Sequence, residues 1–494
     1  MTVDILPDVA LLEIFDFYVS DPKARIEAWH MLVHVCRKWR NVVFGSPRRL
    51  NLRLHCGPRT PVREMLDIWP SLPISVFVYG HKTEDFDSTI AALEHKERIS
   101  EFCMLLAPHT FPLAVLPMMQ QPFPALRRLY LNFQPDDEAM PVVPNSFLGG
   151  SAPHLQEITL VDVPFPGLPK LLFTATRLVT LELYRIPHSG YISPEAMVAC
   201  LSSLTSLEDI YINFESPRSR PGRRPPPPRP TRTLLPALTR LKFRGVSEYL
   251  DEFVARIDVP LLTDLDIAFF HQLIFDTPQL ALFIGRTPKF ETNDGECHLV
   301  FTSMSCSVEF PQTSDGTLEL EIKCEQIDWQ LSSLVQICNS LFTQAHIHTV
   351  ERLYIFDSEH FRLNGQDDTE NSQWLELLHP FATVKDLYIS QGFTPHIAPV
   401  FQELVGETVT DVLPALRTLF LEDTPPSRSV QEAIEQFTSA RQLAGRPIAV
   451  SYWERNKEPE ERSEYEWLEY ERSEDERSED EWSEDDSIAT HAHR

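Results

Sequence analysis

The sequence predicts an α/β chain with a short helical N-terminal part, a long solenoid of strands and helices, and a disordered acidic tail. Three observations predict this organisation. Apolar residues recur at helical spacing within the first fifty residues, a strand-like motif LxxLxL returns ten times, and acidic residues dominate the C-terminal end. We therefore expect a helical domain over residues 1–45, a repeat domain over 46–450 and a disordered tail over 451–494.

Composition and charge restrict the classes of partner. The 494 residues are 43% hydrophobic and 10% aromatic, which is typical of a soluble globular protein, and the formal net charge is −28. Such a charge disfavours binding to nucleic acid, because association with a polyanion needs a basic face. No apolar run reaches the roughly 18 residues of a membrane span, and Asp4 stands where a secretory signal would be basic. We expect a cytoplasmic or nuclear protein that binds neither nucleic acid nor membrane.

The eight cysteines form no CxxC pair, so the sequence indicates reduced thiols and neither a disulfide framework nor a zinc ribbon. A zinc site is conceivable at two places, but the spacing does not support either: Cys297 with His298 and Cys306, or His346 with His348. We expect no metal and no cofactor.

The first element is an amphipathic helix that begins near Leu6. In "LPDVALLEIFDFYV", Pro7 suits a first turn and Leu11, Ile14, Phe15 and Tyr18 recur at i, i+3, i+4 and i+7. "SDPKARIE" ends it.

A second helix is expected from Trp29 to Val43, where Trp29, Leu32, Cys36, Trp39 and Val43 step by three and four residues. Its apolar stripe is too broad for a module of about 40 residues to cover alone. Either the rest of this chain or a partner protein must cover it.

Several short stretches of this N-terminal part, Leu6-Pro7, Ile14-Phe15 and the block Val35-Cys36-Arg37-Lys38-Trp39-Arg40, closely resemble an F-box. The resemblance spans residues 5 to about 45 and departs from the family pattern in the long charged connection "SDPKARIEAWHML". It implies contact with the Skp-type adaptor of a cullin-RING ubiquitin ligase through Leu6, Pro7, Leu11, Ile14, Phe15, Val35, Cys36 and Trp39.

The body of the chain is predicted to be a solenoid. Strand-like segments "RRLNLRLHC" and "SLPISVFVYG" come first, and then copies of LxxLxL begin 23 to 34 residues apart, with one gap of 88. Three copies share the lead-in Pro-Ala-Leu: "FPALRRLYL", "LPALTRLKF" and "LPALRTLFL". Each repeat would supply one strand that is buried by its neighbours, and pieces such as "SPEAMVACLSSLTS" would form helices between strands, with Ser193 as cap and Pro194 in the first turn.

These repeats resemble the irregular leucine-rich repeats of F-box proteins that are abundant in mushroom-forming fungi. The resemblance implies architecture and supplies no client. The alternative is an ordinary α/β domain whose half-buried strands happen to share the motif. In the long gap, over residues 268–349, "CHLVF", "CSVEF" and "LELEIKC" are expected to be strands, either as degenerate repeats or as an extra sheet.

The residues between the marked positions of LxxLxL should face solvent on the inner wall of the solenoid. Tyr recurs there in five copies, accompanied by Arg, and both residue types are enriched at protein interfaces. Tyr also has high β-propensity, which is the alternative explanation. The candidate client-binding residues are Arg127, Arg128, Tyr130, Tyr184, Tyr211, Arg240, Tyr354 and Tyr388.

Two segments lie outside this repeat pattern. The Pro/Arg-rich loop at 217–232 is expected to be solvated polyproline II, although Arg224, Pro227 and Pro230 also match the RxxPxxP spacing of SH3 ligands. From Glu454 to Arg494 the chain has 17 acidic and 6 basic residues, a net charge of −11 that favours disorder.

No motif typical of an active site occurs: GxSxG, a P-loop, a strand-linked GxGxxG and HExxH are all missing. We therefore expect a non-catalytic subunit of a Skp-cullin-F-box ubiquitin ligase, in which the repeat domain holds an unknown client protein. The alternatives are an interaction scaffold outside protein degradation and a hydrolase or transferase without a recognisable motif.

Overall fold

The computed structural model describes residues 6–20, 28–46, 52–57, 60–79, 86–107, 115–133, 142–218, 232–270, 276–291, 295–311, 316–340, 347–357, 371–404, 410–422 and 427–454. Most of the Pro/Arg-rich loop, His346 and the acidic tail from residue 455 lie outside these ranges. The chain divides into two compact units, Met1–Ser451 and Tyr452–Arg494, and of the second unit only its first three residues are described.

Three short helices form the N-terminal part: α1 (Asp8–Ser20), α2 (Ala28–Val35) and α3 (Arg37–Gly45). The single helix expected from Trp29 to Val43 is therefore wrong. Cys36 interrupts it with extended backbone angles, φ −158° and ψ 170°, and its Sγ accepts a hydrogen bond from the backbone N–H of Trp39 at 3.4 Å. Cys36 thus ends one helix and caps the next.

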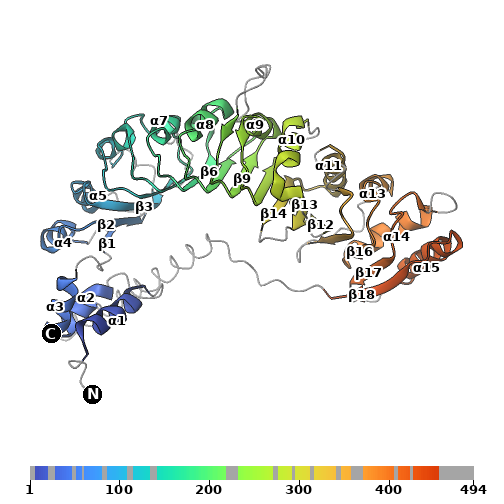
Figure 1. Cartoon of the computed structure of the whole chain (residues 1–494), viewed down its shortest axis with the longest axis horizontal. Helices are drawn as coiled ribbons and strands as arrows, with labels where there is room; N and C mark the ends of the chain where they lie inside the picture. The colour runs from blue at the N-terminus through green and yellow to red at the C-terminus, as the bar shows by residue number, and fades with distance from the viewer. Residues whose placement is uncertain are drawn as a thin grey trace, which may run out of the picture. The chain divides into compact units, whose positions relative to one another are not determined.

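Strands alternate with helices through most of the rest of the first unit (Figure 1). The strands are β1 (Arg53–Cys56), β2 (Ile74–Tyr79), β3 (Ile99–Ala107), β4 (Arg128–Phe133), β5 (Glu157–Val161), β6 (Thr180–Ile186), β7 (Asp209–Phe214), β8 (Thr233–Leu234), β9 (Arg240–Gly245), β10 (Ile257–Asp258), β11 (Asp264–Phe269), β12 (Glu296–Phe301), β13 (Ser305–Pro311), β14 (Thr317–Lys323), β15 (Arg352–Asp357), β16 (Asp386–Ile389), β17 (Thr418–Glu422) and β18 (Ala449–Trp453). The strand runs β7-β8-β9, β10-β11 and β12-β13-β14 depart from this alternation.

Short α-helices and 3-10 turns connect these strands. They are α4 (Val62–Ile68), α5 (Asp87–Leu93), η3 (Met118–Gln120), η4 (Phe147–Gly150), α7 (Leu168–Leu172), η5 (His188–Gly190), α8 (Pro194–Leu201), α9 (Ser247–Val254), α10 (Pro278–Arg286), η6 (Pro288–Glu291), α11 (Ile327–Ser340), α13 (Asn371–Leu378), α14 (Thr394–Glu403) and α15 (Arg428–Leu443). The predicted start of α8 is confirmed, because Ser193 Oγ accepts from Ala196 N–H at 3.2 Å and Pro194 is the first helical residue.

Sixteen of the described strands form one sheet, in the order β1-β2-β3-β4-β5-β6-β7-β9-β11-β14-β13-β12-β15-β16-β17-β18. All ten LxxLxL copies lie at strands of this sheet, and the strands that carry them pair in parallel with their neighbours. The fold is thus a mixed α/β structure with a long, mostly parallel sheet, compatible with a repeat solenoid.

The long gap between repeats holds a three-stranded insertion in the same sheet. The strands predicted there are β12, β13 and β14, and β13 is antiparallel to both of its neighbours. Because β14 then pairs with β11 and β12 with β15, the insertion continues the sheet without interruption. A separate, extra sheet is therefore excluded for these three strands.

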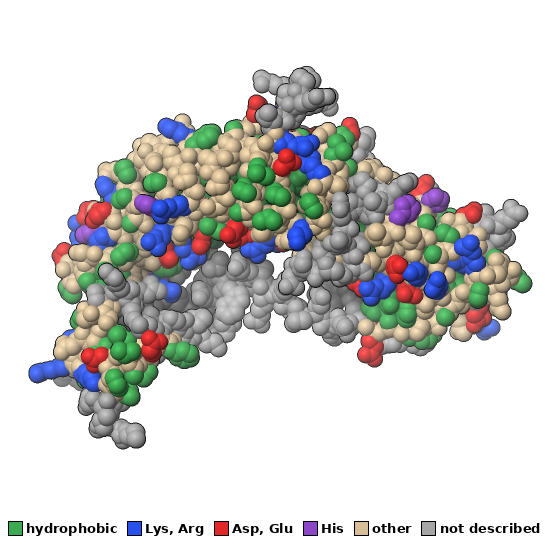
Figure 2. All heavy atoms as spheres, viewed as in Figure 1, with side chains coloured by type: hydrophobic (Ala, Val, Ile, Leu, Met, Phe, Trp, Pro, Cys, Tyr) green, Lys and Arg blue, Asp and Glu red, His purple; other side chains and the backbone are tan. Residues whose placement is uncertain are grey.

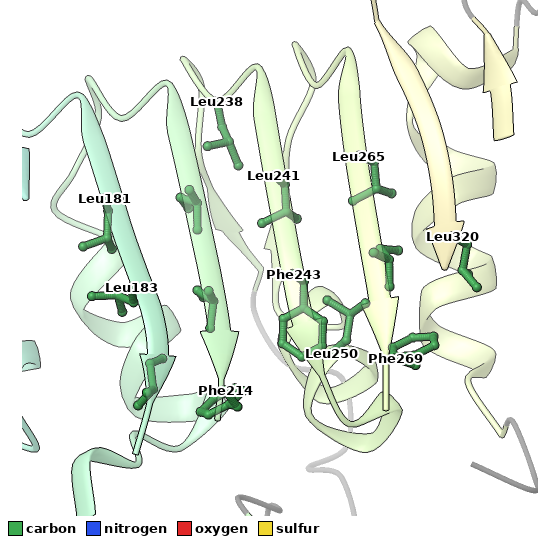
Figure 3. Packing of buried hydrophobic residues seen from close by; sticks show 14 of the residues in the cluster. Leu181, Leu183, Phe214, Leu238, Leu241, Phe243, Leu250, Leu265, Phe269 and Leu320 are labelled. Carbon is green, nitrogen blue, oxygen red and sulfur yellow. The ribbon is translucent and has the colours of Figure 1, made fainter. Parts of the chain in front are cut away.

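The marked apolar residues of successive strands meet on the buried side of the sheet. Leu181, Ile210, Leu241, Leu265 and Leu318 follow one another in register, and each is at most 1% exposed. Figure 3 shows the labelled leucines and phenylalanines packed side by side, with Leu250 reaching them from α9. Burying one such side chain contributes about 1.5–3 kcal/mol, so the apolar row holds the repeats together.

Candidate protein-interaction surfaces

The three N-terminal helices share a small apolar interior. Leu11 and Phe15 of α1 are buried, as are Leu32 of α2 and Val43 of α3. The rings of Phe15 and Trp39 pack at 4.8 Å between centroids, with an interplanar angle of 59°. Phe15 and Trp39 therefore join the first helix to the third.

Polar contacts to the backbone also link these helices. Lys38 Nζ donates to the carbonyl oxygen of Leu6 at 2.7 Å and lies 4.0 Å from a carboxylate oxygen of Asp8. Arg40 Nε donates to the carbonyl oxygen of Val33 at 3.0 Å. The basic residues of the block around Trp39 thus fix where the chain enters α1 and where α2 ends.

The outside of this helical group carries an unusual number of large apolar side chains. Ile14 is 49% exposed, Val35 is 59% exposed and Phe17 is 84% exposed. Figure 2 shows hydrophobic atoms gathered on the surface of these helices. We call the following set the apolar patch: Leu6, Val9, Ile14, Phe17, Met31, Val35 and Phe44. Isolated exposed apolar residues are ordinary, whereas a group of them on a few neighbouring helices makes this part of the chain a candidate contact surface.

The structure divides the eight predicted adaptor-binding residues into three groups by burial. Leu6, Pro7, Ile14 and Val35 are exposed, whereas Cys36 and Trp39 are partly buried. Leu11 and Phe15, which the F-box resemblance also implies for adaptor contact, are buried in the interior described above. Sequence reasoning missed Val9, Phe17, Met31 and Phe44. The spacing of Val9 and Phe17 was a usable signal for these two, since it places both on one side of α1.

The second candidate surface is the exposed face of the sheet. The residue between the last two apolar positions of each strand lies in register with its counterpart on the next strand. We call this line of side chains the middle row; from β1 to β17 it reads His55, Phe77, Cys103, Tyr130, Thr159, Glu182, Tyr211, Lys242, Asp266, Glu319, Glu309, His298, Tyr354, Tyr388 and Phe420.

Ion pairs between neighbouring strands run beside the middle row. Arg128 Nε lies 2.6 Å from Glu157, Arg240 pairs with Asp209, and Arg352 Nη2 lies 2.7 Å from Glu296. Such partly exposed pairs add little stability, about 0–1 kcal/mol each. They show that Arg128 and Arg240, two predicted client-binding residues, already have partners on the sheet.

Four of the five predicted tyrosines that line the sheet take part in aromatic contacts. Tyr184 and Tyr211 meet edge to face with centroids 4.3 Å apart, whereas Tyr354 and Tyr388 stack at 4.2 Å. Tyr130 is partly buried, and burial raises its pKa to about 12.

One detail of this prediction needs correction. Tyr184 is opposite Val161, one place beyond the middle row, so four tyrosines rather than five share that slot. Arg127 is exposed but precedes β4, where its carbonyl oxygen accepts from the N–H groups of Gln156 and Glu157.

Sequence reasoning missed two of the carboxylates in the middle of this face, Glu309 and Glu319. Glu309 and Glu319 lie opposite each other on β13 and β14, and Asp266 follows on β11. Desolvation, together with the charges of Glu309, Asp266 and Glu321, raises the pKa of Glu319 to about 8. Burial likewise raises the pKa of Asp266, although Lys242 lies 3.7 Å from it. The run of strand patterns in the gap predicted these strands but not their order.

Metal and membrane sites are not indicated within the described part of the chain. It contains no group of three or more His, Cys, Asp or Glu side chains placed to hold a metal ion. Cys297 is buried, while the next residue, His298, lies on the exposed face of the sheet, so the two cannot share a site. The eight cysteines are free thiols. Across those same residues, every helix is too short or too polar to span a membrane.

The fold and its two surfaces define a mixed α/β protein with repeat-like architecture and a solvent-exposed sheet face. Comparison with solved structures finds a likeness to the leucine-rich repeat-containing protein LegL7 from Legionella pneumophila, with 10% sequence identity and a TM-score of 0.28 over 79% of this chain and 98% of that chain. No protein-family profile matches the chain, and no curated protein matches it either.

Proposed function

We propose that this chain is the substrate-recognition subunit of a Skp-cullin-F-box type ubiquitin ligase. In this role α1, α2 and α3 bind a Skp-type adaptor, and the exposed sheet face binds a client protein. The observation that carries the proposal is the apolar patch, which occurs on the segment whose sequence resembles an F-box. Such a patch is expected where a partner covers the surface.

The reaction itself would take place elsewhere in the complex. A receptor of this kind accelerates ubiquitin transfer by holding client lysines beside an enzyme carried by the cullin, which raises their effective concentration. It therefore needs two binding surfaces and no catalytic group of its own. A protein with this role works in the cytoplasm or the nucleus.

Co-purification with a Skp-type adaptor tests the first half of the proposal. Ile14→Asp and Val35→Asp place a charge in the apolar patch without disturbing the buried interior, because both side chains are exposed. Each should abolish adaptor binding. Leu282→Asp on α10 is the matched control, since Leu282 is also exposed but lies outside the N-terminal helices, and it should bind normally. Equal binding by all three variants would contradict the proposal.

The alternative is a scaffold that binds proteins outside degradation. The two roles differ in the fate of bound clients. With the proteasome blocked, affinity purification should recover clients, and in untreated cells Ile14→Asp should lengthen their half-lives. If clients bind but their half-lives do not change, the scaffold is the correct description.

A further inference from the structure

We propose that the sheet face from β14 to β17 binds an extended basic segment of the client. Arg or Lys side chains of that segment would lie against Glu309 and Glu319, and its apolar side chains would lie along the aromatic end of the middle row. The inference rests on the proposed function in one respect, which is that the bound segment belongs to a client protein. Peptide binding itself needs no adaptor and is tested separately.

The aromatic end of the middle row is a line of four rings, of which the last three are stacked. His298, Tyr354, Tyr388 and Phe420 come from β12, β15, β16 and β17 and lie in register. The Tyr354 and Tyr388 rings are 4.2 Å apart at 13°, the Tyr388 and Phe420 rings are 4.3 Å apart at 3°, and His298 meets Tyr354 edge to face at 4.8 Å. All four side chains are partly exposed.

This stacking determines what the aromatic row offers to a ligand. Side chains on a strand stand roughly perpendicular to the sheet, so stacked rings cover one another's faces and present their edges and hydroxyl groups outward. Ring edges carry partial positive charge and do not attract cations. The row therefore suits apolar side chains of a ligand.

Carboxylates follow directly on the next two strands. Glu309 on β13 is opposite His298, and Glu319 on β14 is opposite Glu309. Among the described residues, no Lys or Arg forms an ion pair with Glu309 or Glu319. Glu309 accepts a hydrogen bond from the uncharged Ser307 hydroxyl at 3.0 Å, and His298 lies 3.8 Å from it. By contrast, Glu296 beside them is neutralised by Arg352 at 2.7 Å. Positive charge on a ligand would thus complement Glu309 and Glu319 on β13 and β14, and not the aromatic residues on β15 to β17.

The two halves together select a peptide of definite length and polarity. From Glu319 to Phe420 there are five steps between neighbouring strands, which at about 4.8 Å each is about 24 Å, or about seven residues of extended chain. A compact cation would contact the carboxylates alone. An extended segment with basic residues at one end and apolar residues at the other would contact both halves.

The ionisation of Glu319 gives an independent readout. Its pKa is about 8 because of desolvation and because Glu309, Asp266 and Glu321 face it from β13, β11 and its own strand, against only Arg244 as an opposing cation. A bound arginine would favour the ionised carboxylate. Affinity should therefore increase between pH 6.5 and 8.5, with release of a proton on binding below pH 8.

The experiment measures binding of a fluorescent peptide to the full-length chain by anisotropy at about 0.15 M salt, where the diffuse attraction of a chain with net charge −28 is screened. The peptide has about nine residues, with three arginines at one end and two aromatic residues at the other. In two comparison peptides, the arginines become glutamates or the aromatic residues become serines.

Two sets of variants locate the bound peptide. At pH 8.5, above the pKa of Glu319, Glu309→Gln/Glu319→Gln removes charge from the middle row, and Glu432→Gln/Glu435→Gln removes the same formal charge from exposed positions on α15. Tyr388→Ala interrupts the ring stack, whereas Tyr388→Phe preserves it. Circular dichroism checks that each variant is folded.

We expect the middle-row double variant to weaken binding about tenfold and the α15 variant to change it less than twofold. Tyr388→Ala should weaken binding of the aromatic peptide but not of its serine counterpart, and Tyr388→Phe should restore it. Equal effects of both double variants would mean diffuse attraction to a negative chain. No effect of either, or no binding by the unaltered chain, would likewise overturn the proposal, and none of these outcomes depends on adaptor binding.

Discussion

Gly316 precedes β14 and lies against the backbone that leads into β11. A Cβ atom at this position would stand 2.2 Å from the carbonyl oxygen of Thr263, which is far inside van der Waals contact. Because the obstacle is backbone, no side-chain rotation relieves it. The glycine therefore permits the insertion to pair with the repeat sheet.

The substitution Gly316→Ala should lower the free energy of unfolding by about 2–3 kcal/mol, since the two strands would have to separate. Urea denaturation followed by circular dichroism measures the change. Gly45→Ala is the matched control, because a Cβ there meets no atom within 4 Å and the residue ends a helix. Equal stability of the two variants would contradict the close approach.

Glu319 should make the stability of the folded chain depend on pH. Its pKa is about 8 in the folded chain and near 4.5 in an unfolded one, so between these values the folded state holds a proton that the unfolded state has lost. Its contribution to stability is thus fully present below pH 4.5 and is lost as the pH rises through 8. Glu319→Gln cannot ionise.

At pH 8.5 the Glu319→Gln variant should be more stable than the parent chain by about 1–2 kcal/mol, after allowance for solvent screening, and the difference should disappear near pH 5. Denaturation midpoints at several pH values provide the measurement. The exposed Glu64→Gln substitution on α4 is the control and should leave the profile unchanged. A constant difference at all pH values would refute the ionisation argument.

At the scale of elements, α10 depends on a side chain from the preceding repeat. Asp251 of α9 accepts hydrogen bonds at one carboxylate oxygen from the N–H groups of Gln279 and Leu280, at 2.8 and 2.9 Å. These amides lie in the first turn of α10, where no intrahelical acceptor exists. Thr277 precedes α10 but makes no side-chain cap, so Asp251 takes its place from a neighbouring helix.

Asp251→Ala should therefore cost about 1–2 kcal/mol of stability, as the loss of a helix cap does. Asp251→Asn keeps an acceptor oxygen at the same position and should lose about half as much. Hydrogen exchange of the Gln279 and Leu280 amides distinguishes a local effect from a global one. Unchanged protection of both amides in Asp251→Ala would show that the contact does not hold the helix.

The sequence pattern predicts the strands of this structure but not the order in which they pair. LxxLxL was sufficient for the repeat strands, because the pattern follows from one buried and one exposed side of a strand. The order β14-β13-β12 was not predictable, since alternation identifies strands but not their neighbours. For the same reason Tyr354 and Tyr388 could be proposed as surface residues, whereas Glu309 opposite Glu319 emerged only from the pairing.

The break between α2 and α3 has a similar origin. Leu32, Trp39 and Val43 keep a helical spacing across Cys36, so periodicity alone predicts one helix. Folding the chain at Cys36 lets Leu32 and Val43 face the same interior, which the pattern does not reveal. The burial of Leu11 and Phe15 follows from this arrangement. The apolar pattern of the sequence does not show which side of the helix is buried and which is exposed.

For the whole molecule, the two proposed surfaces should act as independent parts of one bridge. The apolar patch belongs to α1, α2 and α3, and the peptide site belongs to β12 to β17, so no residue is shared between them. Substitutions without common partners usually have additive effects. Ile14→Asp should therefore abolish adaptor binding without changing peptide affinity, and Glu309→Gln/Glu319→Gln should do the reverse.

A bridging assay tests this separation directly. Beads that carry the basic, aromatic peptide should retain a Skp-type adaptor only when the intact chain is present, and either set of substitutions should abolish retention. Direct binding to each partner, measured in parallel, shows which contact has failed. Linkage requires that coupling between two ligands be reciprocal. If the adaptor weakened peptide binding, the peptide would therefore reduce the affinity of the adaptor by the same factor. That result would show that the two surfaces are coupled and do not act independently.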